Sequence, residues 1–495
     1  MILIKSVQII DGSGKPAFRG DILIKDDRIS AVSNFIGKKA DTIIDGLGLT
    51  AVPGFIDVNT DSDHYLSLFS NPLQKDFLLQ GVTTIIGGQC GASLAPLLYG
   101  SLRAIRKWGD VSQMNIDWNT IRELKEVLKR LKLGVNFGTL VGYVTIRRDL
   151  VGSEIRDLTQ PEIEIFQHSL FKALDDGALG LSTGLGYSHS RNISYSEIKK
   201  ILTVFSKKPG VYTTHLRDEQ DNLIESVRET IQMAQESGLP TIISHFRPIL
   251  GFESKFQEAL KIIEESLDKG NIYFDVNPFD MSVLPIYTLL PVWAQEGGFE
   301  GMLKILGDEL YRPRIISEIS KSDWVLDNLV IAEAQGYSNI IDKTLKEFSD
   351  NRDLNIIEGL LLLMEITRMH ARFFYKNINQ RVLEEVLSHP RALIGSNSAS
   401  LKDQPSVLRP KRATETFGRF LEIMEQKKAP IEDSIKRITS VPAKIFNISK
   451  RGLLQEGWFA DVVLLKDKNI AEVIVNGRLA VSNGKVSEIG FGSPL

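Results

Sequence analysis

The chain shows two kinds of hydrophobic pattern, and each occupies its own part of the sequence. At both ends, short runs of β-branched residues alternate with turns that contain Gly, Asn or Asp, which predicts strands joined by hairpins. Such runs lie at 2–4, 7–10 and 21–24 and again at 460–465 and 472–475. We therefore expect residues 1–53 and 445–495 to form one small, discontinuous β-sandwich domain.

Residues 54–444 follow a different pattern. Eight short apolar runs are typical of buried strands, and most are separated by helix-length amphipathic segments. Repeated strand–helix units indicate parallel strands, and eight of them predict an α/β fold, a (β/α)8 TIM-type barrel. The gap from 281 to 391 is too long for a loop, so we expect a helical insertion at about 281–350. The strand candidates are residues 55–59, 83–88, 136–142, 178–183, 211–215, 241–245, 272–276 and 392–396.

Composition narrows the classes of function. The 495 residues are 24% charged with a net charge of −3, which argues against a nucleic-acid-binding or membrane-surface protein. The first residues lack the charged and apolar regions of a secretory signal, and no apolar run has the length of a membrane span. The single cysteine cannot form an internal disulfide. We expect a cytoplasmic protein.

The predicted strand ends carry the candidate chemistry, because the active sites of such barrels lie at the carboxyl ends of the strands. Cys90 follows the second strand, His215 ends the fifth and His245 ends the sixth. One sulfur and two imidazoles can hold zinc and leave its fourth position open. Alternatively, the two histidines only cap strands and Cys90 is a small buried residue. The residues alone leave both interpretations open.

Eight segments carry a resemblance to a known family. They lie in order at 52–57, 80–96, 177–184, 214–219, 243–245, 289–298, 394–397 and 457–463, and the second reads Gln-Gly-Val-Thr-Thr-Ile-Ile-Gly-Gly-Gln-Cys-Gly-Ala-Ser-Leu-Ala-Pro. In order and spacing they resemble the amidohydrolase superfamily, and within it the N-acyl-D-amino-acid deacylases, or D-aminoacylases. The resemblance implies a metal-dependent hydrolase in which a zinc-activated water removes the acyl group from a D-amino acid.

The resemblance also implies roles for single residues. Cys90, His215 and His245 match the ligands of one tightly bound Zn²⁺ ion. The family's His-x-His pair on the first strand, which serves a second metal position, is replaced by Asn59 and Asp61. We therefore expect the second metal site to be lost, with Asp61 as a remaining carboxylate ligand.

The position of the general base is the second departure from the family pattern. The family's catalytic aspartate is replaced by Asn397, and an amide does not accept a proton near neutral pH. Asp61 and Asp63 are the candidates to replace it, because they lie on the loop closest to the altered metal position. The alternative for Asp63 and for His64 is a solvated loop.

Three further residues match family positions that contact the substrate. Arg412 matches an arginine that grips the substrate carboxylate, Arg247 stands where lysine is usual, and Tyr187 matches a substrate-binding tyrosine. Guanidinium suits a bidentate carboxylate contact. The alternative for both arginines is a salt bridge at the rim. For residues 217–219, an ion-pair network that supports the metal ligands is at least as good an interpretation as a catalytic role.

Three functions follow, and all take a small molecule with a carboxylate as the partner. The first is a working amidohydrolase that acts on an N-acyl-D-amino acid or a related small amide. The second is a barrel that binds or senses an acyl-amino-acid-like ligand without hydrolysis, which the Asn59 and Asn397 replacements favour. The third is another metal-dependent reaction, for which Asp61 beside the metal position is the only hint.

Overall fold

Parallel strands form a closed barrel at the centre of the molecule. The computed structural model describes residues 1–495 except 107, 110, 112, 113, 153, 188, 189, 267, 269, 296, 297 and 403. Two parallel sheets have the orders β6-β7-β8 and β9-β10-β11-β12-β13-β17. The strands are β6 (Phe55–Asp57), β7 (Val82–Gly87), β8 (Asn136–Thr139), β9 (Val141–Gly142), β10 (Gly180–Gly184), β11 (Val211–His215), β12 (Thr241–Ile243), β13 (Ile272–Val276) and β17 (Ala392–Ile394).

Two junctions join these sheets into a cylinder. Only Leu140 separates β8 from β9, and its backbone NH donates to the Gly87 carbonyl at 3.0 Å, so the two strands act as one. On the other side, the Asn397 NH donates to the Asn59 carbonyl at 2.8 Å, and Thr60 forms a parallel bridge with Ser398. The eight resulting strand positions confirm the predicted barrel.

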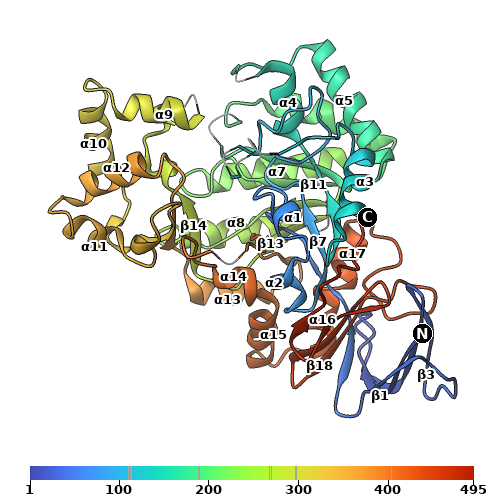
Figure 1. Ribbon diagram of the computed structural model, residues 1–495. Coiled ribbons are helices and arrows are strands. Elements are labelled where there is room, and N and C mark those ends of the chain that lie inside the picture. Colours follow the sequence, from blue (N-terminus) through green and yellow to red (C-terminus); the bar gives the residue numbers. More distant parts are fainter. Residues whose placement is uncertain are drawn as a thin grey trace.

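Amphipathic helices surround the barrel (Figure 1). In α3 (Ile121–Leu131) the buried residues are Ile121, Leu124 and Leu128, one face of a 3.6-residue repeat, and Thr120 caps its first turn. No helix in the described residues has the length and apolar character that a membrane crossing requires. The other helices of this region are α1 (Ser67–Ser70), α2 (Lys75–Leu78), α4 (Tyr143–Val151), α5 (Gln160–Asp175), α6 (Tyr195–Leu202), α7 (Leu223–Ser237), α8 (Glu253–Glu265), α13 (Gln380–Leu387), α14 (Lys411–Thr414), α15 (Thr416–Gln426), α16 (Ile431–Arg437) and α17 (Ser440–Ile445).

Both ends of the chain contribute to a separate β-module, at the lower right of Figure 1. The antiparallel pairing of β5 with β18 joins the amino-terminal and carboxy-terminal strands into one nine-stranded sheet of the described residues. Its strands are β1 (Ile2–Ile9), β2 (Phe18–Lys25), β3 (Arg28–Ser33), β4 (Thr42–Asp45), β5 (Thr50–Pro53), β18 (Val462–Lys466), β19 (Asn469–Val475), β20 (Arg478–Ser482) and β21 (Lys485–Val486).

A second unit is inserted between β13 and α13. Its apolar core runs from Ile286 to Phe373, so the insertion extends past the expected boundary at 350. It also contains an antiparallel sheet besides helices, because short strands pair across a long stretch of sequence. Its elements are β14 (Met281–Pro285), α9 (Gly298–Leu306), α10 (Arg312–Ser320), β15 (Val330–Glu333), α11 (Leu345–Asp350), α12 (Ile356–Ile366) and β16 (Arg372–Lys376).

Candidate metal centre

Three potential metal ligands from three barrel strands meet at one point. Cys90 follows β7, His215 ends β11 and His245 follows β12. The Cys90 Sγ lies 3.6 Å from Nε2 of His245 and 3.9 Å from Nδ1 of His215. One donor atom from each residue lies within 4.8 Å of the other two. Segments 125 and 155 residues apart thus bring together one sulfur and two nitrogens.

The backbone is strained at the strand ends that carry these groups. Cys90, His245 and Asn397 have φ angles of 52°, 41° and 46°, in the left-handed region. Residues other than glycine rarely adopt this region, and such residues gather at functional sites. Each of these left-handed residues lies two or three positions after the end of its strand, where the chain turns away from the barrel wall.

The orientation of His245 is fixed from two sides. Its Nδ1 lies 2.9 Å from Oε1 of Glu219, which leaves Nε2 facing Cys90. Its backbone NH donates to Oδ1 of Asp275 at 3.0 Å. The other oxygen of Glu219 lies 4.0 Å from the Arg247 guanidinium. A carboxylate on the second nitrogen of a ligating histidine sets its ring orientation and raises its basicity.

His215 is held by packing. Its ring centroid lies 4.8 Å from that of Tyr187 and 4.4 Å from that of His245. Gly186 leaves the necessary room, because a Cβ at this position would lie 2.7 Å from Nε2 of His215. Tyr187, which sequence analysis assigned to the substrate, therefore lies against a candidate ligand.

The charges of the three groups depend on one another. Burial acts to raise the pKa of the Cys90 thiol, but hydrogen bonds to the two imidazoles outweigh it and lower the pKa. Burial disfavours the imidazolium of His245, yet the Glu219 carboxylate and the Cys90 thiolate raise its pKa to about 10. The thiolate is thus formed near neutral pH, and it is the form that binds metals.

This donor set fits zinc. One thiolate and two imidazoles are typical ligands, and three protein ligands leave a position for water or substrate. They are also the one set of three Cys, His, Asp or Glu side chains within common reach among the residues that the structure describes. Asp61 is not brought into this set.

The side-chain amide of Asn59 donates hydrogen bonds to a neighbouring carboxylate, that of Asp275. Its Nδ2 donates to both oxygens of Asp275, at 3.2 and 3.1 Å, while its Oδ1 is buried without a hydrogen-bond partner in the described residues. Burial raises the pKa of Asp275 to about 6. Sequence analysis missed Asp275, although it is the only charged residue within its strand.

The loop after β6 is buried, so the alternative interpretation of a solvated loop at Asp63 and His64 is wrong. Both side chains have no exposed surface. The Gly88 NH donates to Oδ2 of Asp63 at 2.6 Å, which ties this loop to the next strand end. This burial raises the pKa of Asp63.

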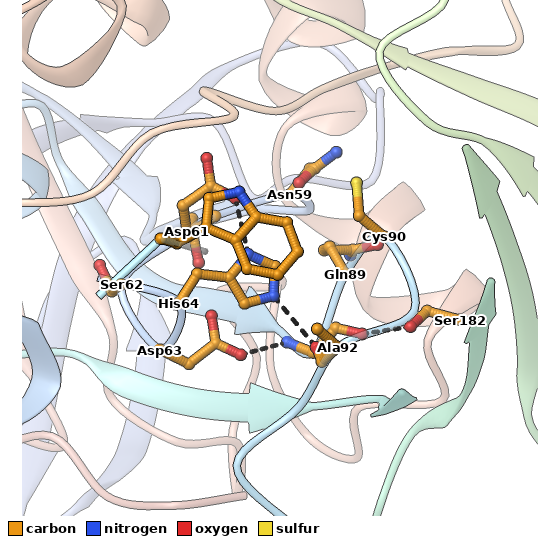
Figure 2. Close-up of polar contacts among 12 residues, drawn as sticks. Asn59, Asp61, Ser62, Asp63, His64, Gln89, Cys90, Ala92 and Ser182 are labelled. Carbon is orange, nitrogen blue, oxygen red and sulfur yellow. Dashed lines mark hydrogen bonds and ion pairs between the residues drawn. The ribbon is translucent and has the colours of Figure 1, made fainter. Parts of the chain in front are cut away.

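Asp61 and His64 form a buried pair (Figure 2). Nδ1 of His64 lies 3.2 Å from Oδ1 of Asp61, and Nε2 lies 3.0 Å from the Ala92 carbonyl oxygen. The imidazole also stacks on Trp108, with 4.3 Å between the ring centroids. Burial opposes the ionised forms, but the carboxylates of Asp63 and Asp61 raise the pKa of His64 to about 9. The pKa of Asp61 is lowered despite burial, chiefly by His64 and then by Arg412.

The two candidate carboxylate-binding arginines differ. Nε of Arg247 donates to the His245 carbonyl at 3.2 Å and Nη1 to Oγ of Ser282 at 3.1 Å, so this guanidinium is engaged. Arg412 is 8% exposed, and no hydrogen-bond or ion-pair partner reaches its guanidinium from the described residues. Burial lowers its pKa to about 10. A salt bridge at the rim does not describe Arg412.

A cavity opens between Asp61 and Arg412 on the barrel side and the inserted unit on the other. The insertion contributes side chains from β14, β15 and β16, and the segment before α14 forms the rest of the wall. Asn397 is half-buried and directly precedes Ser398, one of the lining residues. The lining residues are Asp61, Tyr65, Val283, Ala332, Glu333, Arg372, Phe374, Ser398, Ala399, Leu401, Val407, Leu408, Pro410 and Arg412.

Comparison with known proteins finds relatives that are similar over nearly the whole chain. The chain is 26% identical over 477 residues to a D-aminoacylase of Alcaligenes xylosoxydans xylosoxydans, covering 95% of this chain and 89% of that protein. The chain is thus similar to a D-aminoacylase over nearly its whole length. An N-acyl-D-aspartate deacylase of the same organism is 27% identical, over 97% of this chain and 89% of the relative. No family model matches the chain.

Solved structures of this D-aminoacylase group share the fold. An N-acyl-D-glutamate deacylase from Bordetella bronchiseptica, solved with zinc and a phosphonate inhibitor, has a TM-score of 0.82 at 23% identity, over 100% of this chain and 99% of the other. A D-aminoacylase structure described as defining a subset of amidohydrolases has a TM-score of 0.81 at 24% identity, over 99% and 98%. The barrel and its additional domain are thus common to these proteins.

Proposed function

We propose that the protein is a metal-dependent amidohydrolase that removes the acyl group from an N-acyl-D-amino acid. The convergence of Cys90, His215 and His245 at a barrel mouth is the observation that carries the proposal. The relatives named for deacylation of D-amino acids support the reaction class.

Cys90, His215 and His245 would hold one zinc ion. When bound, zinc polarises a carbonyl and lowers the pKa of water to about 7. Glu219 and Asp275 keep His245 in place for this role. A second ion is not expected, because the amide of Asn59 already donates to Asp275 and Asp61 lies outside the donor set.

Arg412 would bind the substrate carboxylate. It is buried, its guanidinium has no hydrogen-bond partner among the described residues, and it lines the cavity beside the inserted unit. A buried guanidinium without hydrogen-bond partners is costly, and a carboxylate ligand offsets that cost through charge-assisted hydrogen bonds. Arg247, held by Ser282 and close to Glu219, would support the wall beside His245.

Asp61 would accept the proton from the attacking water in place of the missing aspartate. The imidazolium of His64 and the nearby Arg412 keep its carboxylate ionised. His64 fixes its position, since the ring is itself held by Ala92 and Trp108. Asp63 is a weaker candidate, because it is fully buried and its Oδ2 already accepts the Gly88 NH.

A binding or sensing role is the second candidate, favoured by the amides at Asn59 and Asn397. Turnover decides between the two. Zinc-loaded protein should hydrolyse members of a panel of N-acetyl-D-amino acids, with the activity lost on chelation and restored by zinc. Tight ligand binding with no turnover of any member would reject the hydrolase in favour of the sensor.

A further inference from the structure

We propose that this site selects an amino-acid derivative whose α-carboxylate is its only negative charge and whose side chain is apolar. The inference rests on the proposed function, because it takes the cavity beside Arg412 as the substrate site. It distinguishes this chain's substrate from the acidic ones for which two of the relatives are named, the N-acyl-D-aspartate and N-acyl-D-glutamate deacylases.

The walls of the cavity are mainly apolar. Val283 and Phe374 come from β14 and β16 of the insertion, and Leu401, Val407 and Leu408 come from the segment before α14. Two parts of the chain that are distant in sequence thus offer hydrocarbon to the same space. A hydrophobic side chain gains by entering such a space, whereas a carboxylate loses its hydration there.

The second arginine of the cavity is already neutralised. Nη1 of Arg372 lies 2.7 Å from Oε2 of Glu333, and Nη2 donates to the Trp108 carbonyl at 2.8 Å. The face of its guanidinium covers the Tyr65 ring, 4.1 Å from the centroid. Arg372 and Glu333 are 14% and 23% exposed, so the pair is largely shielded from water. The charge of Arg372 is therefore already balanced by Glu333, which makes it a poorer partner for a second substrate carboxylate.

Only one cation in the cavity lining is left for a ligand, within the part of the chain that the structure describes. Arg412 has no partner there, and Arg372 is paired with Glu333. Arg247, close enough to influence Arg412, already donates to Ser282 and His245. One free guanidinium matches one carboxylate.

A second carboxylate would also meet like charge. Asp61 and Glu333 are both among the lining residues, and each faces its own cationic partner. An acidic side chain would compete with them and would be placed against apolar walls. Like charges brought together and unpaired charges at an interface are the usual means by which a site rejects a ligand.

Binding of ligands that cannot be hydrolysed tests this inference. We suggest calorimetric titration of the zinc-loaded protein with N-methanesulfonyl-D-leucine and N-methanesulfonyl-D-glutamate, in which a sulfonyl group replaces the scissile carbonyl. We expect the leucine derivative to bind about 100-fold more tightly. Equal binding, or tighter binding of the glutamate derivative, overturns the inference.

The readout separates this inference from the proposed function. Selective binding of the leucine derivative by a protein that hydrolyses nothing rejects the hydrolase and keeps the selectivity. Turnover of acidic substrates, with tighter binding of the glutamate derivative, keeps the hydrolase and rejects the selectivity.

Glu333→Gln tests the residue that we hold responsible. Freed from its carboxylate, Arg372 should bind the glutamate derivative, and the ratio of the two dissociation constants should narrow about tenfold. Glu300→Gln is the matched control, because Glu300 pairs with Arg368 on the surface of the same insertion, and it should leave the ratio unchanged. An unchanged ratio of dissociation constants in folded Glu333→Gln contradicts the role of Glu333. If this variant does not fold, the titration of the unmodified protein with the two derivatives still tests the selectivity.

Discussion

The carboxylate of Glu219 lies 2.9 Å from Nδ1 of His245, while Nε2, the other nitrogen of that ring, faces Cys90 at 3.6 Å. The same imidazole thus has a carboxylate on one side and a thiol on the other. This arrangement resembles the carboxylate–histidine–metal series of many zinc sites, in which the carboxylate is not a ligand but tunes one.

Glu219→Gln should therefore weaken zinc binding without abolishing it. Loss of such a partner typically lowers metal affinity about 10- to 100-fold, because the histidine loses basicity and orientation. Competition with a chromophoric chelator measures the change. Glu229→Gln is the control, since that carboxylate pairs with Arg217 at 2.8 Å on an adjacent helix, and it should leave the affinity unaltered. Equal affinity in both variants would show that Glu219 does not tune the site.

Replacement of His64 should move the acid limb of the pH–rate profile. The pKa of Asp61 is lowered by His64, so the carboxylate remains ionised as the pH falls. Without the imidazolium that pKa rises, and the loss of activity on acidification should begin at higher pH in His64→Gln. The measurement is kcat/KM against pH, with zinc content checked in each sample. A limb that does not move would exclude Asp61 as the base or His64 as its support.

Restoring a carboxylate at position 397 should raise the rate. Asn397 lies at the strand end where the relatives' base is expected, and its backbone is fixed by the hydrogen bond to the Asn59 carbonyl. A positioned acid–base group raises a reaction rate about 10²- to 10⁴-fold. Asn397→Asp should therefore increase kcat by about 10²-fold or more, because Asp61 is a less well placed base. Asn397→Ala is the control for the loss of the amide. A fall in kcat for Asn397→Asp would show that the amide has its own role.

The barrel was predictable because its signal is repeated along the chain. Eight apolar runs at strand length, most of them separated by amphipathic helix-length segments, predict parallel strands without knowledge of any contact. The positions of Cys90, His215 and His245 followed from the same signal, since strand ends of a barrel share one face. The hairpin turns indicated strands at both chain ends, which the structure joins into one sheet through β5 and β18.

Other features depend on contacts that no sequence pattern encodes. Whether His64 lies in solvent or between Asp61 and Ala92 is decided by the packing of Trp108, 44 positions away. Asp275 reads as a strand residue, and only the structure shows it between Asn59 and His245. The insertion was expected to be helical, and its antiparallel strands were missed. β15 and β16 are only four and five residues long and pair across a gap of many residues, so they leave little signal in the sequence.

Asp57 should make the fold less stable as the pH rises from about 4 to 7. Burial raises its pKa from 3.8 to about 7, so the folded state favours the protonated form. The stabilisation is complete below the unfolded pKa and is lost as the pH approaches the folded one, a loss of about 4 kcal/mol in the free energy of unfolding. Asp57→Asn should flatten this dependence.

Urea denaturation at several pH values, with chelator present to remove any contribution of metal, measures the effect of Asp57. Asp323→Asn, at an exposed position of the insertion, is the control and should retain the slope of the unmodified protein. The same slope in Asp57→Asn would assign it to other groups.

Metal analysis of the purified protein and its ligand variants tests the central claim most directly. The account predicts about one equivalent of zinc in the unmodified protein and almost none in Cys90→Ala, His215→Ala and His245→Ala, each still folded by circular dichroism. A full equivalent of metal in all three folded variants would contradict the account.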